Sequence, residues 1–401
     1  MGTRAWMALA LLCMGVVGAK IGVAADWSVV PAVELRSEYD SNINFSTYTK
    51  QKDYIFTLSP SAEFNYSTDI SKLQGRLGLK GMHYLSQSHL DHVDQNYQIN
   101  GNYAATPRLN FLLKSAYIVD TTLTEELDAS GVIIGRTPRE SILMNPGFSY
   151  ALTEQLLATV TYNFNKVGYA DPRFRNYATQ QANLRLDYLL KDQKTTLIGN
   201  VVAGHTSYPD NDSFQSLGTY LGMNRKFSEN WEATLVGGIN YARLDFSTQV
   251  LDYSYFPFFI LVKTARKKES AVNPYFSFST TRRWTKASFT AGYSRDQSAS
   301  AYGGVSQTNR VNLSFKYDFT ERLAGNLYGD IYRSENTSEL NSSKSNVYQF
   351  SPQITYRLTE KLSLTPAYRF GYREDPVIHR SANRHNVWLM LTYSYPIHYQ
   401  R

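Results

Sequence analysis

Polar and apolar residues alternate along almost the whole chain. In the segment 310–319, the apolar residues Val311, Leu313 and Phe315 alternate with polar neighbours such as Asn312. Successive side chains on a β-strand point to opposite faces, so each segment of this kind has one apolar and one polar face. The pattern predicts a chain built from many long amphipathic strands.

Short polar turns and longer polar segments separate these strands in a regular order. Four of the turns share the phrase apolar–Thr/Ser–Glu–x–apolar, in which the hydroxyl can bond its own backbone and close a tight turn. The eight short turns lie at 68–70, 105–107, 152–154, 191–193, 227–230, 281–283, 319–321 and 358–360. The longer segments lie near 40–51, 88–95, 121–138, 169–175, 207–213, 247–268, 296–305, 335–345 and 374–383. These seventeen connections predict eighteen antiparallel strands, and sixteen is the alternative count.

The N-terminus reads as an export signal. Arg4 begins an n-region, Ala5–Val17 form an apolar core, and small residues at 23–25 precede a cut before Asp26. A membrane anchor is the alternative, but the apolar run is shorter than the roughly 18 residues that span a bilayer. We therefore expect a signal peptide at 1–25 and one domain at 26–401.

Composition favours a transmembrane antiparallel up-and-down β-barrel in a Gram-negative outer membrane over a large soluble β-protein. The single cysteine, Cys13, lies in the signal, so the mature chain would contain neither disulfides nor thiolate metal sites. Tyrosine (31) and phenylalanine (20) are abundant, as aromatic girdles at both membrane interfaces require. The mature chain would hold 39 basic and 34 acidic side chains, a net charge too mild to indicate nucleic acid.

Several strands assign their faces clearly. Apolar residues at alternate positions of 56–66, 287–293, 364–372 and 387–395 would face lipid, and their polar neighbours would face the lumen. The last of these strands has the form of an assembly signal read by the barrel assembly machinery, although the chain ends on Arg401 and not on an aromatic residue.

Projecting the alternation inward gives a set of candidate pore-lining bases, which slightly outnumber the inward acids. Charged rings set ion preference in pores, so one interpretation is mild anion selectivity; the other is that these bases are paired wall charges. The bases are Arg36, Arg76, Lys80, Lys114, Arg185, Arg243, Arg310, Lys316, Arg369 and Arg373.

No catalytic residue, metal or cofactor is expected, and the chain does not read as an enzyme. Residues 89–94 hold two histidines and two aspartates, which fit a polar loop better than a metal site. His205, Ser207 and Asp210 lie close together in sequence, but nothing resembles a nucleophile elbow.

Aromatic residues near the predicted loops admit two interpretations. Tyr39, Tyr84, Tyr169, Tyr208 and Tyr302 could stack on sugars, or could form the interfacial girdle. The segment 247–268 is the longest and most apolar predicted loop, and we expect it to form a constriction or a surface contact.

A resemblance adds to this reading. The first hairpin, with Tyr39-Asp40-Ser41-Asn42-Ile43, and the Thr-Glu-x-Leu turns resemble the outer-membrane β-barrel porins of bacterial exopolysaccharide (exosortase-linked) loci. The resemblance implies a channel that exports or passes a polar, anionic polysaccharide. Its partners would be outer-membrane lipid and periplasmic polysaccharide-export components. A general diffusion porin, or a structural sheath around a separate electron carrier, remains the alternative.

Overall fold

The computed structural model describes residues 25–122, 136–252, 261–299, 305–338, 341–377 and 379–400. The predicted signal peptide lies outside these residues except for Ala25, and stays a prediction. The strands are β1 Asp26–Asp40, β2 Asp53–Ser67, β3 Ser71–Tyr84, β4 His92–Ala104, β5 Leu109–Thr121, β6 Pro138–Ala151, β7 Leu156–Tyr169, β8 Tyr177–Leu189, β9 Thr195–Ser207, β10 Ser213–Ser228, β11 Trp231–Asp252, β12 Leu261–Arg283, β13 Ala287–Ala299, β14 Val305–Asp318, β15 Leu323–Ser338, β16 Asn341–Arg357, β17 Leu362–Asp375, β18 Arg380–Ser394 and β19 Ile397–Gln400. Two short 3₁₀ turns, η1 Ser88–Leu90 and η2 Pro209–Asn211, lie between strands.

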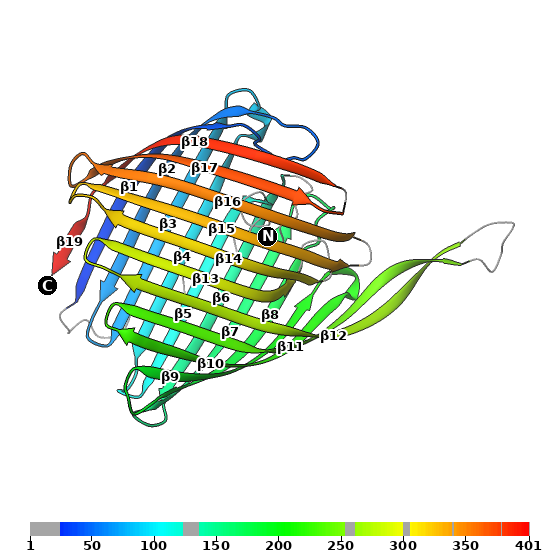
Figure 1. The fold of residues 1–401 in the computed structure, drawn as a ribbon, viewed down its shortest axis with the longest axis horizontal. Helices are drawn as coiled ribbons and strands as arrows, with labels where there is room; N and C mark the ends of the chain where they lie inside the picture. Colours follow the sequence, from blue (N-terminus) through cyan, green and yellow to red (C-terminus); the bar gives the residue numbers. More distant parts are fainter. Residues whose placement is uncertain are drawn as a thin grey trace.

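The strands form one closed antiparallel barrel (Figure 1). Each strand pairs with the next along the chain, and β1 closes the wall by pairing with β18 and then with β19. The short β19 continues the line of β18 after an interruption at Pro396, whose nitrogen has no hydrogen to donate. The wall therefore has eighteen strands, and the prediction of an eighteen-stranded barrel is confirmed.

The strands alternate as the sequence predicted. Residues opposite each other in an antiparallel pair lie on the same face, so the register assigns every strand residue to the outer or the inner face. The outer face carries an apolar belt, defined by exposed side chains such as Leu35, Phe56, Leu58, Leu77, Phe111, Leu184, Leu221, Ile239, Leu313, Phe350 and Leu389.

The threonine turns close as expected. The Thr320 hydroxyl oxygen accepts a hydrogen bond from the backbone N–H of Leu323 at 3.0 Å, and the same bond recurs after Thr153 and Thr359. This bond lets four residues reverse the chain, which explains why the phrase is repeated at one end of the barrel.

Three predicted connections need correction. The segment 335–345 lies mostly in β15, which runs to Ser338, and in β16, which begins at Asn341. The turn expected at 281–283 lies at 284–286, because β12 extends to Arg283 and β13 begins at Ala287. The segment 247–268 is mostly strand: β11 and β12 pair up to Asp252 and Leu261 and project well beyond the other strands (Figure 1). The described parts of this segment therefore do not enter the lumen, and its tip lies outside the described residues. Among the described residues, no helix has the length and apolarity to cross a membrane.

Candidate functional site

The inner face of the barrel is the candidate site, and nine of the ten predicted bases lie on it. Most of them are ion-paired with neighbouring carboxylates on the same face. The pairs are Arg36–Glu38 at 2.5 Å, Arg76–Glu63 at 3.6 Å, Lys80–Asp94 at 3.8 Å, Arg185–Asp187 at 2.8 Å, Arg310–Asp330 at 3.7 Å and Lys316–Asp318 at 3.4 Å. This pairing agrees with the interpretation as balanced wall charges, and a role of these bases in ion preference stays a prediction.

Arg243 is the exception, and its predicted place in the lumen was wrong. Its neighbours Ala242 and Leu244 are buried on the inner face, so Arg243 points outward. The polarity of the two faces reverses here because the strand has risen above the apolar belt. Beyond that height the outer face no longer needs apolar side chains, and alternation alone cannot tell inside from outside.

The loop 41–52, between β1 and β2, folds into the barrel. Phe45 is 1% exposed and packs on Tyr332, Val347 and Ala382 of the inner wall. Ile43 is fully buried against Ile55 and against Tyr84. Because these contacts belong to β15, β16 and β18 on one side and to β2 and β3 on the other, the loop spans several strands of the inner wall and narrows the lumen.

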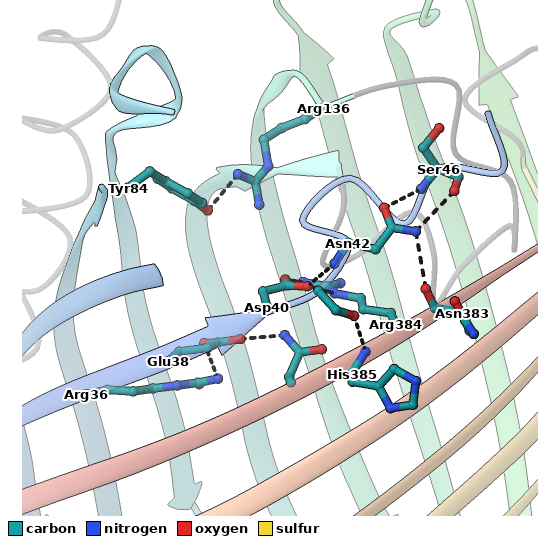
Figure 2. A network of polar contacts seen from close by, with 12 residues as sticks. Arg36, Glu38, Asp40, Asn42, Ser46, Tyr84, Arg136, Asn383, Arg384 and His385 are labelled. Atoms are coloured by element: carbon teal, nitrogen blue, oxygen red, sulfur yellow. Dashed lines mark hydrogen bonds and ion pairs between the residues drawn. The ribbon is translucent and has the colours of Figure 1, made fainter. Parts of the chain in front are cut away.

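A polar network fixes the base of this loop (Figure 2). The fully buried Asp40 carboxylate accepts hydrogen bonds from the backbone N–H of Asn42 at 2.9 Å and from Arg384 Nε at 3.0 Å. The Asn42 amide donates to the carbonyl oxygens of Ser46 and Asn383 and accepts from the Ser46 N–H at 3.1 Å. The motif Tyr-Asp-x-Asn-Ile is thus the anchor of an inward-folded loop.

The same network continues down the inner wall. Glu38 binds Arg36 and accepts from the Asn386 amide at 2.5 Å. The guanidinium carbons of Arg36 and Arg369 lie 4.3 and 5.5 Å from the ring of Trp388. Below the loop, therefore, the wall presents guanidinium groups and a tryptophan from β1, β17 and β18.

The ends of β13 and β14 also lie inside the barrel, on the side opposite the loop 41–52. Val305 at the start of β14 packs on Phe214, Ala242 and Leu244, which face inward from β10 and β11. The Asn240 amide also donates to Gln297 of β13 at 3.1 Å. These contacts place the described ends of β13 and β14 inside the wall formed by β10 and β11.

The tyrosines divide between the outer and the inner face of the wall, and sugar stacking stays a prediction. Tyr39 lies on the outer face and contacts Tyr54 at a ring distance of 5.1 Å, as a girdle residue would. Tyr84 is buried on the inner face, where its ring and hydroxyl contact Arg136 (Figure 2), and Tyr169 also belongs to the inner face. Tyr208 is buried beneath the guanidinium of Arg175, and Tyr302 lies outside the described residues.

Two aspartates near the candidate metal and Ser–His segments form contacts with other residues. Asp91 contacts His83 at 2.7 Å and accepts from the backbone N–H of Tyr84, and these hydrogen bonds lower the pKa of its carboxyl. Next to the Ser–His segment, Asp212 forms an ion pair with Arg175 at 2.7 Å. Within the part of the chain that the structure describes, no group of three His, Cys, Asp or Glu side chains could hold a metal ion.

The sequence alone missed Asp40, Asn42, Phe45 and Arg384 as site residues. One signal was available, since Ile43 and Phe45 are apolar residues inside an otherwise polar loop. Large apolar side chains on a loop between two membrane strands need a surface to cover them, and the inner wall is the surface within reach.

Known proteins resemble this chain in structure but not in sequence. No family model and no curated protein matches it. Among solved structures, OccK1 (OpdK) of Pseudomonas aeruginosa has a TM-score of 0.48 at 9% identity, covering 94% of this chain and all (100%) of that one. OccK2 (OpdF) of the same organism, in complex with glucuronate, has a TM-score of 0.46 at 10% identity, with 93% and 98% covered. The copper transporter OprC has a TM-score of 0.47 at 10% identity, covering 87% of this chain, which spans only 64% of OprC.

Proposed function

We propose that this protein is a porin-like channel of the Gram-negative outer membrane that passes polar, anionic solutes. The observation that carries the proposal is the opposite chemistry of the two faces of a closed wall. A closed barrel pairs the backbone groups of its strands with one another, as a hydrocarbon environment demands. The apolar belt suits lipid, and the charged inner face suits water.

The inner wall beneath the loop 41–52 supports a preference for anions. The loop brings the passage close to β17, β18 and β1, where Arg369 is exposed and Arg36 and Arg373 lie on the same face. Fixed charges act most strongly on an ion where a pore is narrow and partly desolvated. The paired carboxylates Glu38 and Asp40 weaken this field, so we expect a mild selectivity.

An anionic polysaccharide is the cargo that we propose within this class. The resemblance of the first hairpin and the Thr-Glu turns to exopolysaccharide-linked porins supports it. So do the guanidinium–aromatic pairs of the inner face, because sugars bind to aromatic rings and charged donors together. A polymer would need the loop 41–52 to move aside, and a periplasmic export component would have to deliver it.

Conduction tests the channel. Purified protein in a planar bilayer should give discrete current steps. In a salt gradient, the sign of the zero-current potential should indicate that anions pass more readily than cations. A barrel that never conducts, even with the loop 41–52 deleted, would point to a structural sheath and refute the proposal.

The cargo needs a separate test. Deleting the gene should reduce surface polysaccharide, and the wild-type gene should restore it. A conducting protein whose deletion leaves surface polysaccharide unchanged would be a general diffusion porin, and the export proposal would fail.

A further inference from the structure

The apolar belt ends abruptly on strands β8–β11. One row of outward residues joined by register is fully apolar or aromatic: Tyr241, Leu217, Ala203 and Ala182. The next outward row, two residues further along β11, is fully polar: Arg243, Gln215, His205 and Gln180. On β11 this change falls between Tyr241 and Arg243, and it marks where the outer face of this strand leaves hydrocarbon.

The height agrees with a bilayer. Outward side chains of β11 run from Trp231 near the short turn to Tyr241, and ten residues at about 3.4 Å each, tilted by about 40°, rise roughly 26 Å. Outer-membrane barrels carry an apolar band of about 25 Å, so Tyr241 marks its outer edge. Arg243 then lies about 5 Å higher, at the level of lipid headgroups.

Arg243 belongs to a basic patch, which we define as Arg243, Arg266 and Lys268. The register places Lys268 opposite Asp245 and Arg266 opposite Ser247, so all three bases face outward on β11 and β12. Asp245 is the acid among them, 3.1 Å from Arg266 and 3.7 Å from Lys268. Both of those basic side chains are still half-exposed or more, at 51% and 60%. The patch therefore keeps an excess of positive charge.

We propose that this basic patch binds the phosphate groups of the glycolipid in the outer leaflet. A guanidinium presents two parallel N–H donors to phosphate, and a base beside an anionic membrane surface contributes attraction that water screens only partly. The patch faces outward and begins where the apolar belt stops, so the acyl chains of the same lipid would lie against Tyr241 and Ile239. The inference rests on the proposed function in placing the barrel in an outer membrane, with its short turns toward the periplasm and its longer loops outside.

Native mass spectrometry of the purified full-length protein tests this site, with bisphosphorylated lipid A as the probe. The variant Arg243→Gln/Arg266→Gln/Lys268→Gln should bind it more weakly by about fivefold for each charge removed. Arg333→Gln is the matched control: Arg333 also faces outward just above the belt, two residues after Ile331 on β15, but pairs with Glu335 at 2.6 Å. The control should change binding by less than about twofold.

Two further measurements test whether the patch recognises phosphate carried on a lipid. Dephosphorylated lipid A should bind wild type and the triple variant equally weakly, and millimolar inorganic phosphate should not displace lipid A. Equal binding of both lipids to wild type, full displacement by free phosphate, or an unchanged triple variant would each overturn the proposal. Should the triple variant fail to fold, judged by heat-modifiable migration, Arg243→Gln alone carries the test. Conductance of the triple variant should match wild type, so a failure of lipid binding and a failure of the channel are separable.

Discussion

Replacing Phe45, the side chain that packs the loop 41–52 against the inner wall, should widen the channel. Phe45 is almost completely buried between β15, β16 and β18, whereas the other aromatic residue of the loop, Tyr48, is exposed and its ring centre lies 3.9 Å from the guanidinium carbon of Arg380. In Phe45→Ala the loop keeps its polar anchor at Asp40 and Asn42 but loses its far attachment. The wall itself should be unaffected, because its strands are held by their own ladders.

The size of the effect follows from burial. Replacing a fully buried phenylalanine by alanine costs about 3–5 kcal/mol. Applied to docking of the loop, even the lower value raises the ratio of undocked to docked loop by roughly 150-fold. A loop that spends a small fraction of its time undocked in wild type would then be open for much of the time.

Single-channel recording measures this change directly. Phe45→Ala should show a higher mean conductance with frequent transitions, and the loop should become sensitive to added protease. Gly371→Val should do the same by another route, since a Cβ at Gly371 would lie 3.2 Å from the Phe45 ring. Thr49→Ala, in the same loop but at an exposed side chain, is the control and should behave as wild type. Unchanged conductance and protease resistance in both Phe45→Ala and Gly371→Val would refute the role of the loop as a constriction.

Three other changes have expected outcomes. Asp40→Asn breaks the buried pair with Arg384 and should lower the free energy of unfolding in detergent by about 3 kcal/mol, measured by urea titration; a loss below about 1 kcal/mol would contradict the burial argument. Arg369→Glu should shift the zero-current potential in a potassium chloride gradient toward cation preference, and no shift would remove this base from the ion path. Hydrogen bonds from the Thr195 hydroxyl and nearby backbone N–H groups lower the pKa of the Asp192 carboxyl. Its support of the turn between β8 and β9 is therefore present above about pH 4 and is lost as pH falls through the depressed pKa. The protection factor of the Thr195 amide should therefore fall in acid, and Asp192→Asn should abolish the pH dependence of that protection factor.

The fold was predictable from the sequence because the membrane-spanning parts obey one local rule. A period of two with apolar residues on one face needs no knowledge of distant contacts, and the Thr320 turn closes through a bond three residues long. The strand count followed from counting connections. Boundaries failed at 247–268, where the strands continue past the membrane and nothing in the local pattern marks the end of pairing.

The site was less predictable because it depends on contacts between distant residues. Asp40 meets Arg384 only when the barrel closes, and their separation of 344 residues leaves no local trace. Arg243 was misplaced for a related reason: the polarity of the outer face changes with the height of the residue relative to the membrane, and the local pattern does not show that height. The motif around Asn42 was visible, but its purpose required the loop to be seen folded inward.

The loop 41–52 and the closing seam of the barrel form a single unit, which has a consequence for assembly. Polar contacts that tie the loop to the wall run to β18, through Asn383, Arg384 and His385. The pairing of β1 with β18 joins residues far apart in the chain, and contacts of this kind form late in folding. Until the last strand pairs with the first, the loop therefore lacks these polar contacts and the packing of Phe45 on Ala382. A barrel whose assembly stops before β1 pairs with β18 would have a wider lumen at this end. The narrow lumen is therefore a property of the fully closed barrel.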